Sequence, residues 1–231
     1  MLSDGNCNIY FDFDNTITPF DVLDDIIERF AVNDDWKAME EKWASGKIGA
    51  RECLEGQLKC VRVSKSKLSG YLSGIKVDPY FHRILDALGE RDIAPVILSD
   101  NFHFIVDSIL KNNGIKKIKI YSNELKFKKD QLIPSFPHQH KSYPGSGNCK
   151  PMHILKYSRK NCINIYVGDG RSDIDAAETS DFVFAKDSLL KHFRSKKKKC
   201  VPFNDLGDVY RYLNTKEDLI CQENQLCRKR T

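Results

Sequence analysis

The chain has 231 residues, of which 41% are hydrophobic and 30% charged, and its formal net charge is +5 at pH 7. This length suits one α/β core with an insertion, or two modest domains, and it can bury a real core. No apolar run reaches the roughly 18 residues that span a bilayer. The first residues also lack the basic start and apolar stretch of a signal peptide. We therefore expect a cytoplasmic protein without membrane association.

The cysteines indicate the same compartment, because they show neither a C-x-x-C pair nor a regular framework. Reduced thiols are the expected state. The eight positions are Cys7, Cys53, Cys60, Cys149, Cys162, Cys200, Cys221 and Cys227.

An apolar run near the start of the chain ends in two carboxylates one residue apart. Residues 9–11 predict a buried parallel strand, and Asp12 and Asp14 follow it. In open α/β sheets, ligands bind outside the carboxyl ends of the strands, where two acids suit Mg²⁺ and a phosphoryl group. Taken alone, the motif could also be an Asp-rich loop that caps the next helix.

Residues 16–79 change to helical spacing, which predicts a small helical bundle inserted into the α/β core. Its core is expected to contain Phe20, Leu23, Ile26, Ile27, Phe30, Trp36, Met39, Trp43, Leu54, Leu58, Val61, Leu68, Leu72 and Ile75.

After Pro79, helices alternate with apolar strands, which predicts an α/β fold with a Rossmann-like parallel sheet flanked by helices. The expected domains are a core of residues 1–15 and 80–215, a helical insertion of residues 16–79 and a tail of residues 216–231. Helices are expected near 80–88 and 104–110, after Pro151 and from Ile174. Strands are expected near 94–98, 118–121, 163–167 and 182–184, with a hairpin and long loop over 122–148.

Three later features fall where a phosphate site would need them. Ser99 follows the apolar run 94–98, although a serine after a strand is often only a helix cap. Lys150 precedes a predicted helix, but a single lysine could equally lie on the surface. The strand at 163–167 runs into a Gly-Asp-Gly turn that contains Asp169, and Asp173 follows four residues later. This last combination is the most specific.

These four motifs, in this order, resemble those of the haloacid dehalogenase-like phosphohydrolases, and the resemblance covers roughly residues 8–203. A helical insertion between the first and second motifs is similar to the type 1 cap of the phosphoserine phosphatase-like branch. The resemblance implies that Asp12 is the nucleophile and Asp14 the general acid and base. It also implies that Ser99 and Lys150 bind the phosphoryl oxygens.

The resemblance further implies a magnesium enzyme. Mg²⁺ would be held by Asp12, the backbone carbonyl of Asp14 and Asp169, while Asp173 would orient Lys150 or a metal-bound water. An alternative zinc site, formed by His138, His140 and Cys149, lacks a fourth ligand at regular spacing.

Four residues are predicted to contact the substrate. Asp21 falls where phosphoserine phosphatases hold the substrate ammonium. Glu55 aligns with their carboxylate-binding arginine, and Arg51 lies one helical turn away. Asp100 and Asn101 replace their Gly-Gly pair, and Ser-Asp at this point is similar to vertebrate-type phosphocholine and phosphoethanolamine phosphatases.

Other segments resemble the methionine-salvage 2-hydroxy-3-keto-5-methylthiopentenyl-1-phosphate phosphatase group, namely residues 122–124, 136–138, 175–177 and 180–186. We interpret the chain as closest to this group, acting on a small phosphomonoester. Phosphocholine, phosphoethanolamine and phosphoserine remain alternative substrates. A phosphotransferase and a non-catalytic binding module are alternatives of other classes, and the retention of every motif carboxylate argues against the binding module.

The basic block at residues 191–199 carries only one aromatic residue, Phe193, which argues against nucleic-acid binding. It is expected to be a solvated helix end and loop. The stretch after Thr215 is expected to be a surface helix or frayed tail. No feature of the sequence indicates an oligomeric state.

Overall fold

A computed structural model describes residues 7–159 and 162–215, and the chain divides into two compact units. The first unit contains residues 7–12, 78–97 and the described residues from 150 onward. The second contains residues 13–77 and 98–149. The chain therefore passes from one unit to the other four times.

The first unit is built on a parallel sheet with β1 (Cys7–Phe11) inside it. β1 pairs with the start of β2 (Val96–Phe102) on one side and with β5 (Ile163–Gly168) on the other. β6 (Phe182–Ala185) and β7 (Val201–Pro202) continue the sheet beyond β5. Strands paired on both edges and covered on both faces need apolar side chains on both faces. This explains the continuous apolar run that ends at Phe11.

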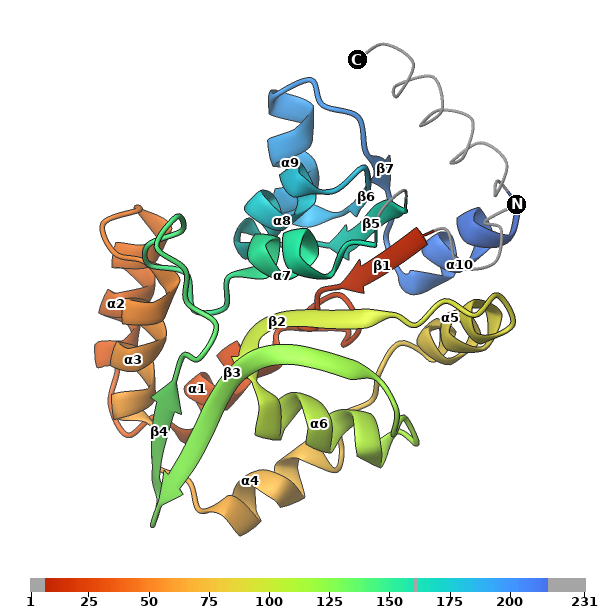
Figure 1. Cartoon of the computed structure of the whole chain (residues 1–231). Coiled ribbons are helices and arrows are strands. Elements are labelled where there is room, and N and C mark those ends of the chain that lie inside the picture. Colours follow the sequence, from red (N-terminus) through yellow and green to blue (C-terminus); the bar gives the residue numbers. More distant parts are fainter. Residues whose placement is uncertain (1–6, 160–161, 216–231) are drawn as a thin grey trace. The chain divides into compact units, whose positions relative to one another are not determined.

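Helices cover both faces of this sheet (Figure 1). Phe81 of α5 packs edge-on against Phe11, with ring centroids 5.5 Å apart. α5 begins where its sequence favours a start, because Asp78 accepts a hydrogen bond from the Tyr80 N–H and proline occupies the first turn. One face carries α5 (Pro79–Gly89) and α10 (Leu206–Thr215); the other carries α7 (Lys150–Tyr157), the 3₁₀ helix η1 (Arg171–Asp173), α8 (Ile174–Thr179) and α9 (Asp187–Ser195). The predicted α/β class is confirmed.

The second unit combines helices with a β-hairpin. The remainder of β2 lies next to β3 (Lys119–Lys128), which turns back through β4 (Gln131–Ser135) in antiparallel pairing. The predicted hairpin is thus present, but β3 continues well beyond the predicted end at Tyr121. The helices of the second unit are α1 (Val22–Phe30), α2 (Asp35–Ala44), α3 (Ala50–Cys60), α4 (Lys65–Leu72) and α6 (His103–Asn112).

The predicted apolar core of the helical segment is only partly right. α1 and α4 bury their apolar stripes as expected. α2 buries no residue, and Trp36, Met39 and Trp43 are half-buried. Phe20 is 39% exposed. α2 packs mainly against α3, so its apolar stripe is covered from one side only.

The basic block has the predicted position at a helix end. α9 ends at Ser195, residues 196–199 are exposed, and Lys198 forms an ion pair with Glu178 at 2.7 Å. The six cysteines between residues 7 and 200 are free thiols. Cys221, Cys227 and the predicted tail lie outside the described residues. Within residues 7–159 and 162–215, no helix is long and apolar enough to cross a bilayer.

Candidate active site

A buried lysine bridges two carboxylates in the first unit. Lys150 begins α7, its side chain is 1% exposed, and its Nζ lies 2.5 Å from Asp12 Oδ1 and 2.7 Å from Asp173 Oδ1. Asp12 directly follows β1, and its N–H donates to the carbonyl of Val167 at 2.9 Å. Strand pairing therefore fixes the backbone of Asp12, while the ammonium fixes its side chain.

Asp173 is held by hydrogen bonds at both carboxylate oxygens. Oδ1 accepts from Lys150 and from the Tyr166 hydroxyl at 2.6 Å. Oδ2 accepts from the backbone N–H groups of Asp169 at 3.0 Å and Gly170 at 2.9 Å. Burial raises the pKa of Tyr166 well above its ordinary value, and the charge of Asp173 adds to the effect, so the phenol stays protonated as a donor. Asp173 thus links the lysine to the turn that carries Asp169.

The glycine before Asp169 has a steric reason. A Cβ atom at Gly168 would lie 2.6 Å from Asp173 Oδ2. Any larger residue would push Asp173 away from the turn and break its bonds to the backbone. The first glycine of the Gly-Asp-Gly turn is therefore a packing requirement of this site.

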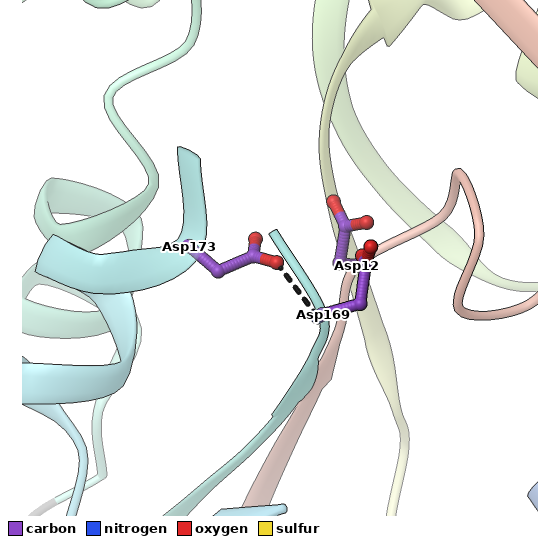
Figure 2. Close-up of side chains that lie close together, drawn as sticks. All are labelled: Asp12, Asp169 and Asp173. Carbon is purple, nitrogen blue, oxygen red and sulfur yellow. Dashed lines mark hydrogen bonds between the residues drawn. The ribbon is translucent and has the colours of Figure 1, made fainter. Parts of the chain in front are cut away.

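Three carboxylates, two of which contact Lys150, lie close together and could hold a metal (Figure 2). Asp12, Asp169 and Asp173 each offer an oxygen, all within 4.8 Å of one another. One ammonium cannot balance three carboxylates, and hard oxygen donors suit Mg²⁺. Because both oxygens of Asp173 already accept two hydrogen bonds each, Asp12 and Asp169 fit the metal best. Among the residues described, His138, His140 and Cys149 form no comparable group.

Asp14 and Ser99 lie in the second unit, and one asparagine contacts both. Asn101 Nδ2 lies 3.0 Å from each oxygen of Asp14, and the Asn101 N–H donates to Ser99 Oγ at 2.9 Å. Asp14 Oδ1 also accepts from the Val22 N–H at 3.0 Å. Asn101 Oδ1 accepts from the Phe102 N–H at 2.7 Å. The Asn101 amide is therefore engaged within the protein, and its predicted substrate contact stays a prediction.

Asn148 ties the segment before Lys150 to the second motif. Its N–H donates to Asp100 Oδ1 at 2.8 Å, and its side chain donates to the carbonyls of Ser99 at 2.9 Å and Tyr121 at 2.8 Å. Asn148 is 2% exposed. Sequence reasoning missed this residue as well as Tyr166, and no spacing marks either of them. A substrate contact for Asp100 stays a prediction.

Asp21 has a local structural role. It is the N-cap of α1, and its carboxylate accepts from the Asp24 N–H at 2.9 Å. A carboxylate at a helix N-terminus is also favoured by the helix dipole. Asp21 is exposed, and its predicted contact with the substrate stays a prediction.

Glu55 lines a cavity of about 610 Å³ in the second unit. Its Oε1 lies 2.9 Å from Arg51 Nε, and a second nitrogen of Arg51 donates to Gln139 at 3.2 Å. The Arg51 guanidinium also lies 5.8 Å from the centroid of the Phe136 ring. This wall therefore presents a paired charge instead of an isolated carboxylate. The other lining residues are Gly49, Glu52, His140, Lys141, Tyr143, Pro144, Gly145 and Ser146.

The fold is that of the haloacid dehalogenase-like class. A solved phosphoserine phosphatase, in a phospho-aspartyl intermediate analogue state, superposes with a TM-score of 0.70 at 20% identity, covering 90% of this chain and 98% of that one. A substrate-bound phosphoserine phosphatase gives a TM-score of 0.68 at 18% identity, covering 91% and 99%. At these identities the likeness concerns the fold.

The sequence comparisons identify the family. A family model described as Putative Phosphatase matches residues 7–201, and the chain belongs to that family. It is 27% identical over 219 residues to the 2-hydroxy-3-keto-5-methylthiopentenyl-1-phosphate phosphatase of Bacillus pumilus, covering 93% of this chain and 90% of the relative. It is 29% identical over 214 residues to the bifunctional enzyme MtnB/MtnX of Bacillus licheniformis, covering 89% and 48%.

Proposed function

We propose that this phosphatase hydrolyses a small phosphomonoester through a phosphorylated Asp12 and requires Mg²⁺. The observation that carries the proposal is the buried Lys150, bonded to both Asp12 and Asp173. A lysine this deeply buried must be compensated by charge, and here its partners are the carboxylates of two separate motifs. Such a group can reduce the repulsion that a phosphoryl dianion meets as it approaches Asp12.

Asp12 acts as the nucleophile. A carboxylate oxygen forms a bond to phosphorus, and the bond from phosphorus to the ester oxygen breaks. Lys150 reduces the repulsion between the carboxylate and the anionic ester, and it stabilises charge on the phosphoryl oxygens in the transition state. When bound by Asp12 and Asp169, Mg²⁺ supplies further positive charge at the same place.

Asp14 follows Asp12 after one residue and acts as acid and then base. Its proton passes to the leaving alkoxide, and the resulting carboxylate removes a proton from the water that attacks the phosphorylated Asp12. Inorganic phosphate leaves and both carboxylates return to their first state. The Ser99 Oγ accepts a hydrogen bond from the Asn101 N–H. The hydroxyl proton of Ser99 has no acceptor among the described residues. That proton is available to a phosphoryl oxygen.

The relatives direct the choice of substrate. The chain aligns over 93% of its length with an enzyme named for 2-hydroxy-3-keto-5-methylthiopentenyl 1-phosphate, so this enol phosphate is the first substrate to test. The Arg51–Glu55 pair supports an ester without a carboxylate, because the guanidinium already has an anionic partner. Phosphoethanolamine and phosphocholine are the alternatives, supported by the Ser99-Asp100 sequence, and phosphoserine is expected to be poor.

A phosphomonoester panel tests the proposal. The four esters named above are assayed with Mg²⁺, with a chelator, and with Ca²⁺ in place of Mg²⁺. Of these three conditions, turnover is expected only in the presence of Mg²⁺. Ca²⁺ should inhibit, because its looser coordination lets Asp12 bind through both oxygens. Full activity in chelator would contradict the metal requirement, and a kcat/KM for phosphoserine above all other esters would contradict the substrate class.

A phosphotransferase uses the same nucleophile, so the panel also includes an added alcohol as acceptor. Transfer of phosphate to the alcohol in preference to water would overturn hydrolysis as the main reaction. The expected product is inorganic phosphate in amounts equal to the released alcohol.

A further inference from the structure

We infer that Asn101 is a positioning residue, which fixes the Asp14 carboxylate and the Ser99 hydroxyl relative to one another. The inference rests on the proposed roles of Asp14 and Ser99. It concerns contacts within the second unit, where all three residues lie. It replaces the direct contact between Asn101 and substrate that the sequence predicted.

The contact of Asn101 with Asp14 restrains rotation of the Asp14 carboxylate. Nδ2 lies 3.0 Å from each of its oxygens, so one N–H of the amide is shared between both oxygens in a bifurcated hydrogen bond. A one-point contact would leave the carboxylate free to rotate about its last bond, whereas this contact and the Val22 N–H oppose rotation. Asn101 is 1% exposed, so its amide is shielded from water, while Asp14 itself is half-buried.

The orientation of the Asn101 amide follows from its surroundings. The Phe102 N–H donates to Oδ1 at 2.7 Å, and an amide nitrogen could not accept that bond. Nδ2 must therefore face Asp14. The same residue holds Ser99 through its backbone N–H, so a single backbone position aligns two functional side chains. Glycine at this position could hold Ser99 but could not contact Asp14.

Kinetics of Asn101→Ala test the inference. We expect kcat for an alkyl phosphate to fall about 10- to 100-fold, as acid–base catalysis loses alignment. KM should change less than about twofold, because no contact with the substrate is lost. With p-nitrophenyl phosphate, whose leaving group needs no proton, the initial burst of p-nitrophenolate should persist and only the later steady state should slow.

Asn113→Ala is the matched control. Asn113 lies in the same unit, and its side chain bonds only to backbone groups, those of Ile75, Val77 and Ile109. It should lower thermal stability without changing the ratio of alkyl to aryl turnover. If Asn101→Ala instead raises KM with kcat unchanged, or slows both ester classes equally including the burst, the positioning role is wrong.

A crystal structure of the Asn101→Ala protein gives a readout independent of turnover. Asp14 is expected to adopt a new rotamer or several rotamers, and an unmoved Asp14 would overturn the inference. Failure of the proposed function is distinguishable, because then the parent protein itself would hydrolyse no phosphomonoester with Mg²⁺, whatever the position of Asp14 in the variant.

Discussion

A buried cluster of two ion pairs and a single exposed ion pair have similar chemistry and opposite surroundings. Lys150 is 1% exposed between Asp12 and Asp173, whereas the side chains of Arg51 and Glu55 are 47% and 37% exposed at a cavity wall. Removing one partner of a buried pair leaves an uncompensated charge, while exposed pairs contribute little. The comparison indicates that the proposed catalytic charges are fixed by the fold, and that the cavity wall can change at little cost in stability.

The largest effect is expected from replacing Asp12, the proposed nucleophile of the buried cluster. Asp12→Asn should lower kcat at least about 10⁴-fold, because an amide cannot attack phosphorus, and loss of a nucleophile has effects of this order. The measurement is steady-state release of phosphate, with circular dichroism to verify folding. Asp107→Asn, which removes an exposed partner of Lys111, serves as control and should remain active. Activity of Asp12→Asn within tenfold of the parent would refute the nucleophile assignment.

Removing the central cation should destabilise the fold itself. Lys150→Met leaves two buried carboxylates without their ammonium, and we expect the free energy of unfolding to fall by about 3–5 kcal/mol. Urea denaturation measures the change. Lys111→Met removes a lysine that is 59% exposed in its pair with Asp107, and its effect should stay within about 1 kcal/mol. Equal effects of the two substitutions would contradict the contrast between buried and exposed pairs.

A smaller loss of stability is expected from removing a hydrogen bond to Asp173, the carboxylate that contacts Lys150. Tyr166→Phe deletes one hydrogen bond to the buried Asp173 carboxylate, and it should cost about 1.5–3 kcal/mol of stability. Tyr80→Phe is the control, because the Tyr80 hydroxyl has no hydrogen-bond partner among residues 7–159 and 162–215. Thermal unfolding of both variants decides the point, and a Tyr166→Phe protein as stable as the control would show that Asp173 does not need this donor.

Substitutions in the exposed Arg51–Glu55 pair should have the smallest effect, and that effect should be on substrate specificity. If Glu55 faces the substrate, Glu55→Arg should raise phosphoserine turnover relative to phosphoethanolamine by roughly tenfold, about 1.4 kcal/mol. Stability should change by less than about 1 kcal/mol. Glu55→Gln, which removes the charge without reversing it, should give an intermediate ratio. A ratio of kcat/KM values unchanged in both variants would show that Glu55 does not influence the choice of substrate.

Much of the fold was predictable because buried parallel strands and the residues at their ends leave a continuous signal. Asp12 and Asp169 follow neighbouring strands, and Lys150 begins a helix directly before a proline. The candidate site residues were predicted by motif, and the structure shows that Lys150 contacts both Asp12 and Asp173. These contacts join positions that are 138 and 23 residues from Lys150.

The missed features all depend on tertiary contacts that no local sequence pattern reveals. Periodicity identifies the apolar stripe of α2, but it does not tell whether one neighbour or two will cover it. Tyr166 is an ordinary strand residue until its hydroxyl reaches Asp173. Asn101 was assigned to the substrate from its place beside Ser99, and only the structure shows its amide against Asp14.

The position of β1 inside its sheet also has a consequence for synthesis of the protein. The Asn8 side chain of β1 donates a hydrogen bond to the Asn164 side chain, 156 residues away, and all five residues of β1 pair with β5. At roughly 5–20 residues per second, β5 leaves the ribosome about 8–30 s after β1. Throughout that interval an apolar strand keeps at least one edge unpaired, and an unpaired edge is prone to aggregation unless a chaperone shields it. A nascent chain stalled before Ile163 would therefore depend on chaperones most at its first strand.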